Sequence, residues 1–275
     1  MPLNVPVFFT RLASSVVFVA VMLTGLLWHD RAFVILICLI NILCLREYFI
    51  LLQKMEPDTY WPEWLPNVVQ VTSLIIIIPC YRKEAFMEFT YIFWTALPLI
   101  PVLLLLVSIM SKRISLFAVL QALGGLLYIT LPMIMLLFMR LHSFIFPLAL
   151  ICLIWSNDTM AYLVGSFFGK TQFSAISPKK TWEGTLGGAL VTIIAAVLFG
   201  HFSHIFRIAD WAILALCATV AGTMGDLMES KLKRMAEVKD SGALMPGHGG
   251  ALDRFDSLLI ATPFAFAYVI YFMPV

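Results

Sequence analysis

The sequence predicts an all-α, polytopic integral membrane protein with about nine transmembrane helices. Hydrophobic residues make up 61% of the 275 residues and charged residues only 12%, against roughly 45–50% and about 25% in a soluble domain. Apolar runs that approach the roughly 20 residues needed to cross a hydrocarbon core recur along the chain. The net charge of +2 comes with no basic stripe carrying interleaved aromatic residues, so we exclude nucleic acid as a partner.

Apolar runs separated by polar breaks define the expected spans. The first follows Arg11 and superficially suits a signal peptide, but it lacks a small-x-small cleavage site and is long enough to span. The third is short and follows Asp58–Pro66, whose Trp, Tyr and Pro residues are typical of a membrane interface. The nine spans are residues 11–28, 31–52, 67–80, 88–110, 115–138, 144–168, 184–205, 209–226 and 255–273.

The distribution of basic residues indicates the orientation in the membrane. With nine spans, the N-terminus and every second loop share one side, which carries 13 of the 18 Lys and Arg residues. Positive residues favour the cytoplasm, so we expect a cytoplasmic N-terminus. The location that we expect is a bacterial inner (plasma) membrane. No repeat or linker divides the chain. We predict a single membrane domain, 1–275, in which residues 1–150 serve packing and dimerisation and residues 151–275 carry the chemistry.

The end of the sixth span contains an unusual polar pair, Asn157 and Asp158. A carboxylate inside a membrane is costly and indicates function, although Asp158 could instead cap a broken helix. The segment Gly165–Thr171 is similar to a phosphate loop, but it is one residue short of that motif and does not follow a strand, so we do not interpret it as one.

The next signal is the segment Ser177–Gly184. Ser177 as N-cap and Pro178 at the first helical position predict the start of the seventh span there, with Lys179 and Lys180 in its first turn. Cations are unfavourable at that end of a helix, so their presence indicates a site for an anion. The alternative is that both lysines contact anionic lipid headgroups.

The segment Gly225–Ser257 gathers eleven charged residues, five cations and six anions, in a chain that is otherwise apolar. This mixture favours carboxylates for metal and cations for phosphate over a one-signed membrane anchor. Helical spacing places Asp226, Ser230 and Lys233 on one face. Asp253 and Asp256 stand at i, i+3 where the last span begins, so both can face one ion, unless they only cap the helix.

Two further features lie around this segment. Pro246–Gly250 contains glycines that let backbone N–H groups approach phosphate, with His248 among them. His201 and His204 have a spacing that could bring two imidazoles together, but no third ligand is near, so we interpret them as interfacial histidines.

Taken together, these segments resemble the phosphatidate cytidylyltransferases, also called CDP-diacylglycerol synthases. Ser230–Asp256, which reads SKLKRMAEVKDSGALMPGHGGALDRFD, is similar to the signature of that family. Further matches are N-D-T-x-A-Y from Asn157, G-K at Gly169, S-P-K-K-T-W-E-G from Ser177 and G-D-L-x-E-S from Gly225. The resemblance is good from about residue 155 to residue 257 and only topological before it. Met245 and Ala251 stand where the family has larger apolar residues, which affects local packing.

The resemblance implies a reaction in which CTP and phosphatidate give CDP-diacylglycerol and pyrophosphate, in phospholipid biosynthesis. It implies Mg²⁺, with a second cation, K⁺ or Mg²⁺, as an option. It also implies a nine-helix fold in the lipid bilayer, a homodimer and an active site that faces the cytoplasm. The phosphate of phosphatidate is already a nucleophile, so positioning and charge neutralisation should dominate over acid–base catalysis.

On this basis we predict Asp226, Asp253 and Asp256 as metal ligands and, with Lys233, as the catalytic residues. The residues expected to bind substrate are Asn157, Asp158, Lys170, Ser177, Lys179, Lys180, Ser230, Arg234, Lys239, Asp240, Gly247, His248, Gly249, Gly250 and Arg254.

Two other functions are compatible with parts of the pattern. A CTP-dependent polyprenol or dolichol kinase would use similar carboxylates and cations, but would transfer the γ-phosphate to an alcohol. A transporter would explain charge in the membrane, yet it predicts ionisable residues near mid-membrane in several spans, whereas here they gather at one face.

Overall fold

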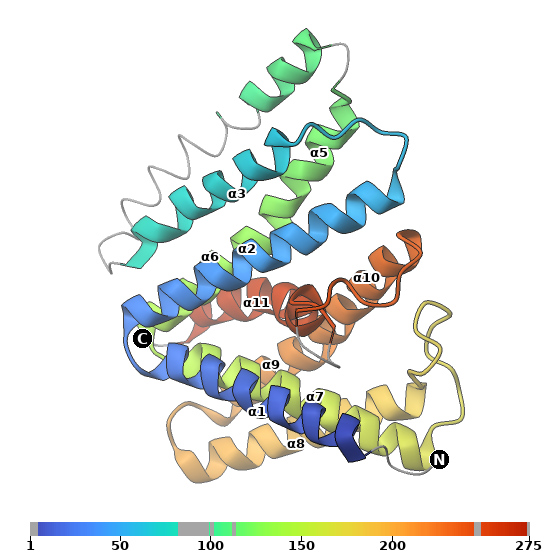
Figure 1. Cartoon of the computed structure of the whole chain (residues 1–275). Helices are drawn as coiled ribbons and strands as arrows, with labels where there is room; N and C mark the ends of the chain where they lie inside the picture. The colour runs from blue at the N-terminus through green and yellow to red at the C-terminus, as the bar shows by residue number, and fades with distance from the viewer. Residues whose placement is uncertain (1–4, 82–98, 100–101, 112–113, 245–248, 274–275) are drawn as a thin grey trace. The chain divides into compact units, whose positions relative to one another are not determined.

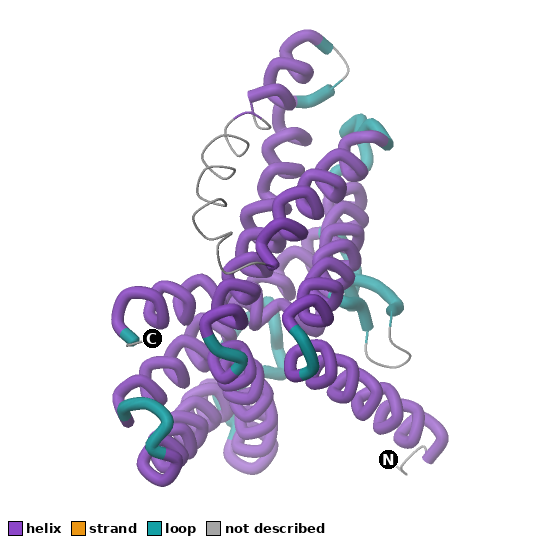
Figure 2. The backbone as a smooth tube through the Cα atoms, turned by 90° about the vertical axis from the view of Figure 1, so that its left-hand side faces the viewer, coloured by secondary structure: helices purple, strands orange, loops and turns teal. Residues whose placement is uncertain are grey.

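The computed structural model describes residues 5–81, 99, 102–111, 114–244 and 249–273. Helices and loops make up this described part of the chain (Figure 2), and the one β-type pairing in it is an isolated antiparallel bridge between Gln172 and Thr181. The all-α prediction is therefore confirmed. The α-helices of the described part include α1 (Val5–Leu27), α2 (Asp30–Met55), α3 (Trp64–Ile77), α5 (Leu116–Gly125), α6 (Leu131–His142), α7 (Ile145–Phe168), α8 (Trp182–Ser203), α9 (Ile208–Leu216), α10 (Gly222–Met235) and α11 (Leu252–Phe272) (Figure 1).

A helix covers each expected span except 88–110, which falls largely outside the described residues. Among the described residues, six helices are long and apolar enough to cross a membrane, and two shorter apolar helices cover Ala13–Leu27 and Trp64–Cys80. Two of the six are composite, because π-helical segments at Leu126–Thr130 and Cys217–Ala221 join α5 to α6 and α9 to α10. The chain is thus a polytopic integral membrane protein.

By its contacts the chain forms two compact units, Met1–Leu141 with Met235–Arg254, and His142–Arg234 with Phe255–Val275. The first unit is built around α2, whose buried face includes Phe33, Ile37 and Leu45. Polar contacts fix its neighbours. Asn41 donates to the Ser73 hydroxyl at 2.7 Å within the apolar core, and the Tyr48 hydroxyl donates to the Gln121 carbonyl at 3.0 Å.

In the second unit, glycines let α7 and α8 pack backbone to backbone. A Cβ atom on Gly188 would lie 2.6 Å from the Ala161 Cα, and one on Gly184 would lie 2.8 Å from the Gly165 Cα. Gly184 and Gly188 are four residues apart and so face the same side of α8. Small residues at this spacing are a common contact between membrane helices, where close van der Waals packing drives association.

The opposite end of the second unit is held by a network around Asp210. This buried carboxylate accepts from both Nε and Nη2 of Arg207, at 3.1 and 2.9 Å, and from the Tyr268 hydroxyl at 2.8 Å. Arg207 also donates to the Phe272 carbonyl at 2.9 Å. The network ties the start of α9 to the end of α11.

A third close approach joins α10 to α11. A Cβ atom on Gly225 would lie 3.0 Å from the Ser257 Cα, 3.1 Å from the Asp256 carbonyl carbon, and closer still to the Asp256 carbonyl oxygen. Because only a glycine fits there, the residue after it, Asp226, comes next to the first turns of α11.

Candidate functional site

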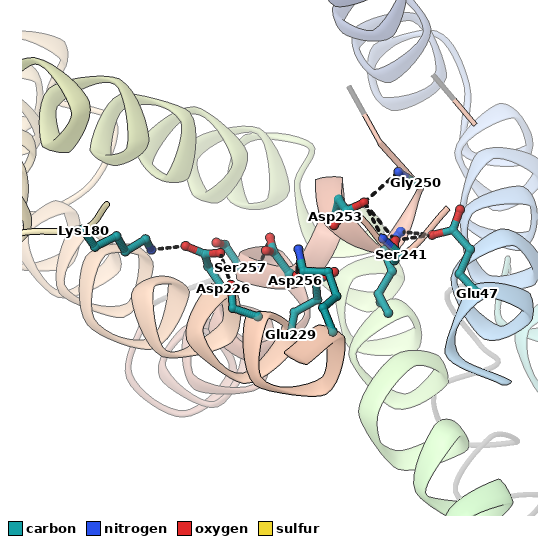
Figure 3. Close-up of polar contacts among 12 residues, drawn as sticks. Glu47, Lys180, Asp226, Glu229, Ser241, Gly250, Asp253, Asp256 and Ser257 are labelled. Carbon is teal, nitrogen blue, oxygen red and sulfur yellow. Dashed lines mark hydrogen bonds and ion pairs between the residues drawn. The ribbon is translucent and has the colours of Figure 1, made fainter. Parts of the chain in front are cut away.

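Three carboxylates from α10 and α11 meet at this contact. One oxygen from each of Asp226, Glu229 and Asp256 lies within 4.8 Å of the others (Figure 3). Asp226 and Glu229 are three residues apart on α10 and therefore share a face. Glu229 is fully buried and Asp256 is 8% exposed. We refer to these three side chains as the carboxylate cluster.

Cations and hydrogen-bond donors surround the carboxylate cluster. Lys180 forms an ion pair with Asp226, and Lys233 forms one with Glu229. The backbone N–H of Ser257 donates to Asp256 at 2.6 Å, and the Ser230 hydroxyl donates to Asp226 at 3.4 Å. The three carboxylates of the cluster outnumber the two lysines paired with them.

The donor set of the carboxylate cluster fits a divalent metal ion. Hard cations such as Mg²⁺ and Ca²⁺ take oxygen ligands, and carboxylates are their usual side-chain ligands in proteins. Buried carboxylates this close together repel one another strongly unless positive charge lies between or beside them. The two lysines supply part of that charge, and a divalent cation would supply the rest.

Glu229 is the member of the carboxylate cluster that the sequence reasoning missed. It stands three residues after Asp226 and lies within the G-D-L-x-E-S match. Both the spacing and the motif are visible in the sequence. The charged stretch around it contains six acidic residues, and the sequence alone does not tell which of them are buried.

Asp253, the third predicted metal ligand, is engaged elsewhere. Its Oδ2 accepts from the Gly250 N–H at 2.7 Å, from the Ser241 N–H at 2.9 Å and from the Ser241 hydroxyl at 3.0 Å (Figure 3). The structure therefore does not include Asp253 in the carboxylate cluster. Both backbone donors precede Leu252, the first residue of α11, so these contacts hold the segment before the helix.

A second carboxylate, Glu47 on α2, binds the same segment. It accepts from the Ser241 hydroxyl at 2.7 Å and from the backbone N–H groups of Ala251 and Leu252, both at 2.8 Å. The sequence reasoning did not single out Glu47. The available signal was its charge inside the apolar span 31–52, because an ionisable residue in such a span is a candidate functional residue by default.

The predicted helix start at Ser177 is wrong. α8 begins at Trp182, and its N-cap is Thr181, whose hydroxyl accepts from the Gly184 N–H at 3.1 Å. Residues before Thr181 form a loop, in which the Lys180 carbonyl accepts from the Phe173 N–H at 2.8 Å and the Ser177 carbonyl accepts from the Lys180 N–H at 3.0 Å. These loop contacts outweigh the Ser-Pro start signal, so Lys179 and Lys180 precede the helix.

The loop before α8 is also fixed by Glu183. Its carboxylate accepts from the backbone N–H groups of Lys170 and Thr171, each at 3.1 Å. Gly169 lets the chain leave α7 closely, since a Cβ atom there would lie 2.7 Å from the Thr181 hydroxyl oxygen. These contacts hold the connection between α7 and α8, in which Lys180 pairs with Asp226.

The remaining predicted substrate-binding residues differ in burial. Asn157 is buried, and its Oδ1 accepts no hydrogen bond from the part of the chain that the structure describes. Gly249 has a φ of 81°, a conformation that favours glycine. Gly247 and His248 lie outside the described residues. The exposed members are Asp158, Lys170, Lys179, Arg234, Lys239, Asp240 and Arg254.

Fold and site together define a helical integral membrane protein with a largely buried carboxylate cluster whose donor set fits a cation. The chain belongs to the cytidylyltransferase family, whose sequence model matches residues 9–272. It is 41% identical over 138 residues to the phosphatidate cytidylyltransferase of Haemophilus influenzae, a stretch that covers 48% of each chain.

Two further relatives carry the same name. The chain is 43% identical over 129 residues to the enzyme of Synechocystis sp., which is 46% of this chain and 44% of that one. It is 44% identical over 115 residues to the enzyme of Bacillus subtilis, which is 41% of this chain and 43% of that one. The chain therefore spans a little under half the length of the relatives it matches.

Proposed function

We propose that this protein transfers a cytidylyl group from CTP to phosphatidate, giving CDP-diacylglycerol and pyrophosphate. The observation that carries the proposal is the carboxylate cluster with Lys180 and Lys233, set among apolar helices. Such a site suits two polyanionic substrates, one of them anchored in lipid. Membership of the cytidylyltransferase family and relatives named phosphatidate cytidylyltransferase support the same reaction.

We assign the metal ligands to Asp226, Glu229 and Asp256, which replaces Asp253 by Glu229. A bound Mg²⁺ would neutralise phosphate oxygens of CTP and hold them in place. Lys180 and Lys233 already neutralise two of the carboxylates, and each ammonium group can also contact a phosphate oxygen that enters the site.

The proposed reaction depends on positioning of the substrates rather than on a strong base. The phosphate monoester of phosphatidate attacks the α-phosphorus of CTP, the bond to the β-phosphate oxygen breaks, and pyrophosphate leaves with the electron pair. No proton needs to be removed from the nucleophile when its phosphate is ionised. Holding the two anions in line against their mutual repulsion is therefore the main task of the cations.

The orientation and assembly follow as further parts of the proposal. CTP is a cytoplasmic anion that does not cross membranes, so the carboxylate cluster should open to the cytoplasm, as the distribution of basic residues also predicts. We propose the bacterial inner membrane as the location, and the homodimer remains a prediction.

Position-labelled CTP tests the reaction. The purified protein would be incubated with phosphatidate, Mg²⁺ and CTP that carries radioactive phosphorus at either the α or the γ position. We expect the α label in the lipid fraction and the γ label in pyrophosphate. The Asp256→Asn variant controls for contaminating enzymes and should transfer neither label. Transfer of the γ label to a lipid alcohol would instead establish a kinase, and no label in any lipid would refute both reactions.

A further inference from the structure

Glu47 is a buried carboxylate that the proposed reaction does not use directly. Its side chain lies on α2 and the residue is 7% exposed. It is separated by roughly 200 residues from the three groups that donate to it, the Ser241 hydroxyl and the N–H groups of Ala251 and Leu252. These donors lie on both sides of the glycine-rich turn, so one carboxylate joins the beginning and the end of segment 241–252 (Figure 3).

The backbone of this segment packs directly against the Glu47 carboxylate. A Cβ atom on Gly242 would lie 2.7 Å from the Glu47 Cδ, and one on Gly250 would lie 2.6 Å from it. Neither position has room for a side chain. The two glycines therefore serve close approach to Glu47 as well as any contact with a ligand.

Asp253 completes the arrangement from the other side. It shares the Ser241 hydroxyl with Glu47 and also accepts from the N–H groups of Ser241 and Gly250. A Cβ atom on Gly249 would lie 2.6 Å from the Asp253 Oδ2. Two carboxylates thus hold the segment, and the hydrogen bonds are charge-assisted, which makes them short and strong.

Both oxygens of Glu47 are needed for these contacts. Oε1 accepts from Ala251, and Oε2 accepts from Leu252 and Ser241. Leu252 is the first residue of α11, and Asp256 stands one turn further along the same helix. Fixing the N–H of Leu252 therefore fixes the end of the helix that carries Asp256.

We propose that Glu47 is a positioning residue for the cytidylyl transfer, and this inference rests on the proposed function. It holds Ser241 by its hydroxyl, and Ala251 and Leu252 by their backbone N–H groups. The start of α11, the helix that carries Asp256, is thereby held in one orientation. A buried carboxylate is costly unless it is fully hydrogen-bonded, and the orientation of the loop is what these hydrogen bonds define.

The Glu47→Gln variant tests this role, because glutamine keeps the shape but has one acceptor oxygen and one NH₂ group. The NH₂ group would then face a backbone N–H donor. We expect a drop of at least tenfold in kcat, a smaller change in KM, and faster hydrogen–deuterium exchange at Gly250–Leu252. The matched control is Arg46→Gln, the exposed neighbour on α2, which should leave all three quantities unchanged.

A second variant covers the case in which Glu47→Gln does not fold. Ser241→Ala removes the hydroxyl that Glu47 shares with Asp253 and leaves both bonds from Ala251 and Leu252 to Glu47. It should keep the wild-type unfolding temperature in detergent and lose several-fold in kcat. Wild-type kcat in the folded Ser241→Ala protein, or in a folded Glu47→Gln protein, would overturn the proposal.

The exchange measurement separates this proposal from the proposed function. If the wild-type protein transfers no cytidylyl group but Glu47→Gln still accelerates exchange at Gly250–Leu252, the proposed reaction is refuted. The inference that Glu47 holds the start of α11 is then still supported. Unchanged exchange in the folded Glu47→Gln variant would refute the positioning role of Glu47, whichever reaction the protein catalyses.

Discussion

Gly225→Ala should separate the geometry of the carboxylate cluster from its chemistry, because the variant changes no charged residue. The added Cβ atom would lie 3.0 Å from the Ser257 Cα and 3.1 Å from the Asp256 carbonyl carbon. Carbon atoms at contact are about 3.5–4.0 Å apart. α10 and α11 must therefore separate by about 0.5–1 Å at the place where Asp226 faces Asp256.

The expected effects on stability and activity differ in size. Overpacking costs about 1–3 kcal/mol, and the better helix propensity of alanine offsets about 0.5–1 kcal/mol of it. The net loss should leave the protein folded. A displacement of about 1 Å in an active site can lower the rate about 10²-fold. We therefore expect activity to fall far more than stability.

The assay is the rate of CDP-diacylglycerol formation by the purified variant, with its unfolding temperature measured in the same detergent. Gly222→Ala is the matched control on the same helix, because its Cβ atom would lie 3.6 Å from the Ser257 Cβ and has room. It should keep full activity. Gly225→Ala activity within threefold of wild type, or an equal loss in Gly222→Ala, would refute the reasoning.

Three further predictions follow from the site. Glu229→Gln should lower activity about 100-fold or more while the protein stays folded, because an amide is a poorer metal ligand than a carboxylate. Wild-type turnover in this variant would show that Glu229 is not a metal ligand. Lys180→Ala should lower kcat/KM for CTP roughly 10²-fold, whereas Lys179→Ala, which changes an exposed side chain, should have a smaller effect. Equal effects of the two variants would show that the ion pair of Lys180 with Asp226 does not matter for activity. In a background without native cysteines, Ala243→Cys should react with a membrane-impermeant reagent only from the cytoplasmic side and His201→Cys only from the other side. Labelling of Ala243→Cys from outside intact cells would contradict the predicted orientation of the protein in the membrane.

The helices could be predicted because length and hydropathy are local properties of the sequence. Every expected span within the described residues is helical, although α10 continues beyond the predicted end at residue 226. The start of α8 could not be predicted, since Ser177 and Pro178 suit a loop as well as a helix start. The choice is made by the Thr181 cap and by backbone pairing with Phe173.

The candidate site was predicted in part for a similar reason. Asp226 and Asp256 were identified from spacing and motif, because both features are visible along the chain. To predict Glu229 one must know which acidic residues of α10 are buried, and that depends on how α10 packs against α11 at Gly225. To predict Glu47 one must know a contact between residues roughly 200 positions apart, which no local pattern encodes.

Binding of Mn²⁺ as a stand-in for Mg²⁺, followed by electron paramagnetic resonance on the purified protein, tests the central claim most directly. The claim is that Asp226, Glu229 and Asp256 hold the cation and that Asp253 holds the loop. We predict that the wild-type protein binds Mn²⁺, that Glu229→Gln loses this binding, and that folded Asp253→Asn keeps it within about threefold. Wild-type affinity in Glu229→Gln, together with loss of binding in Asp253→Asn, would contradict the account.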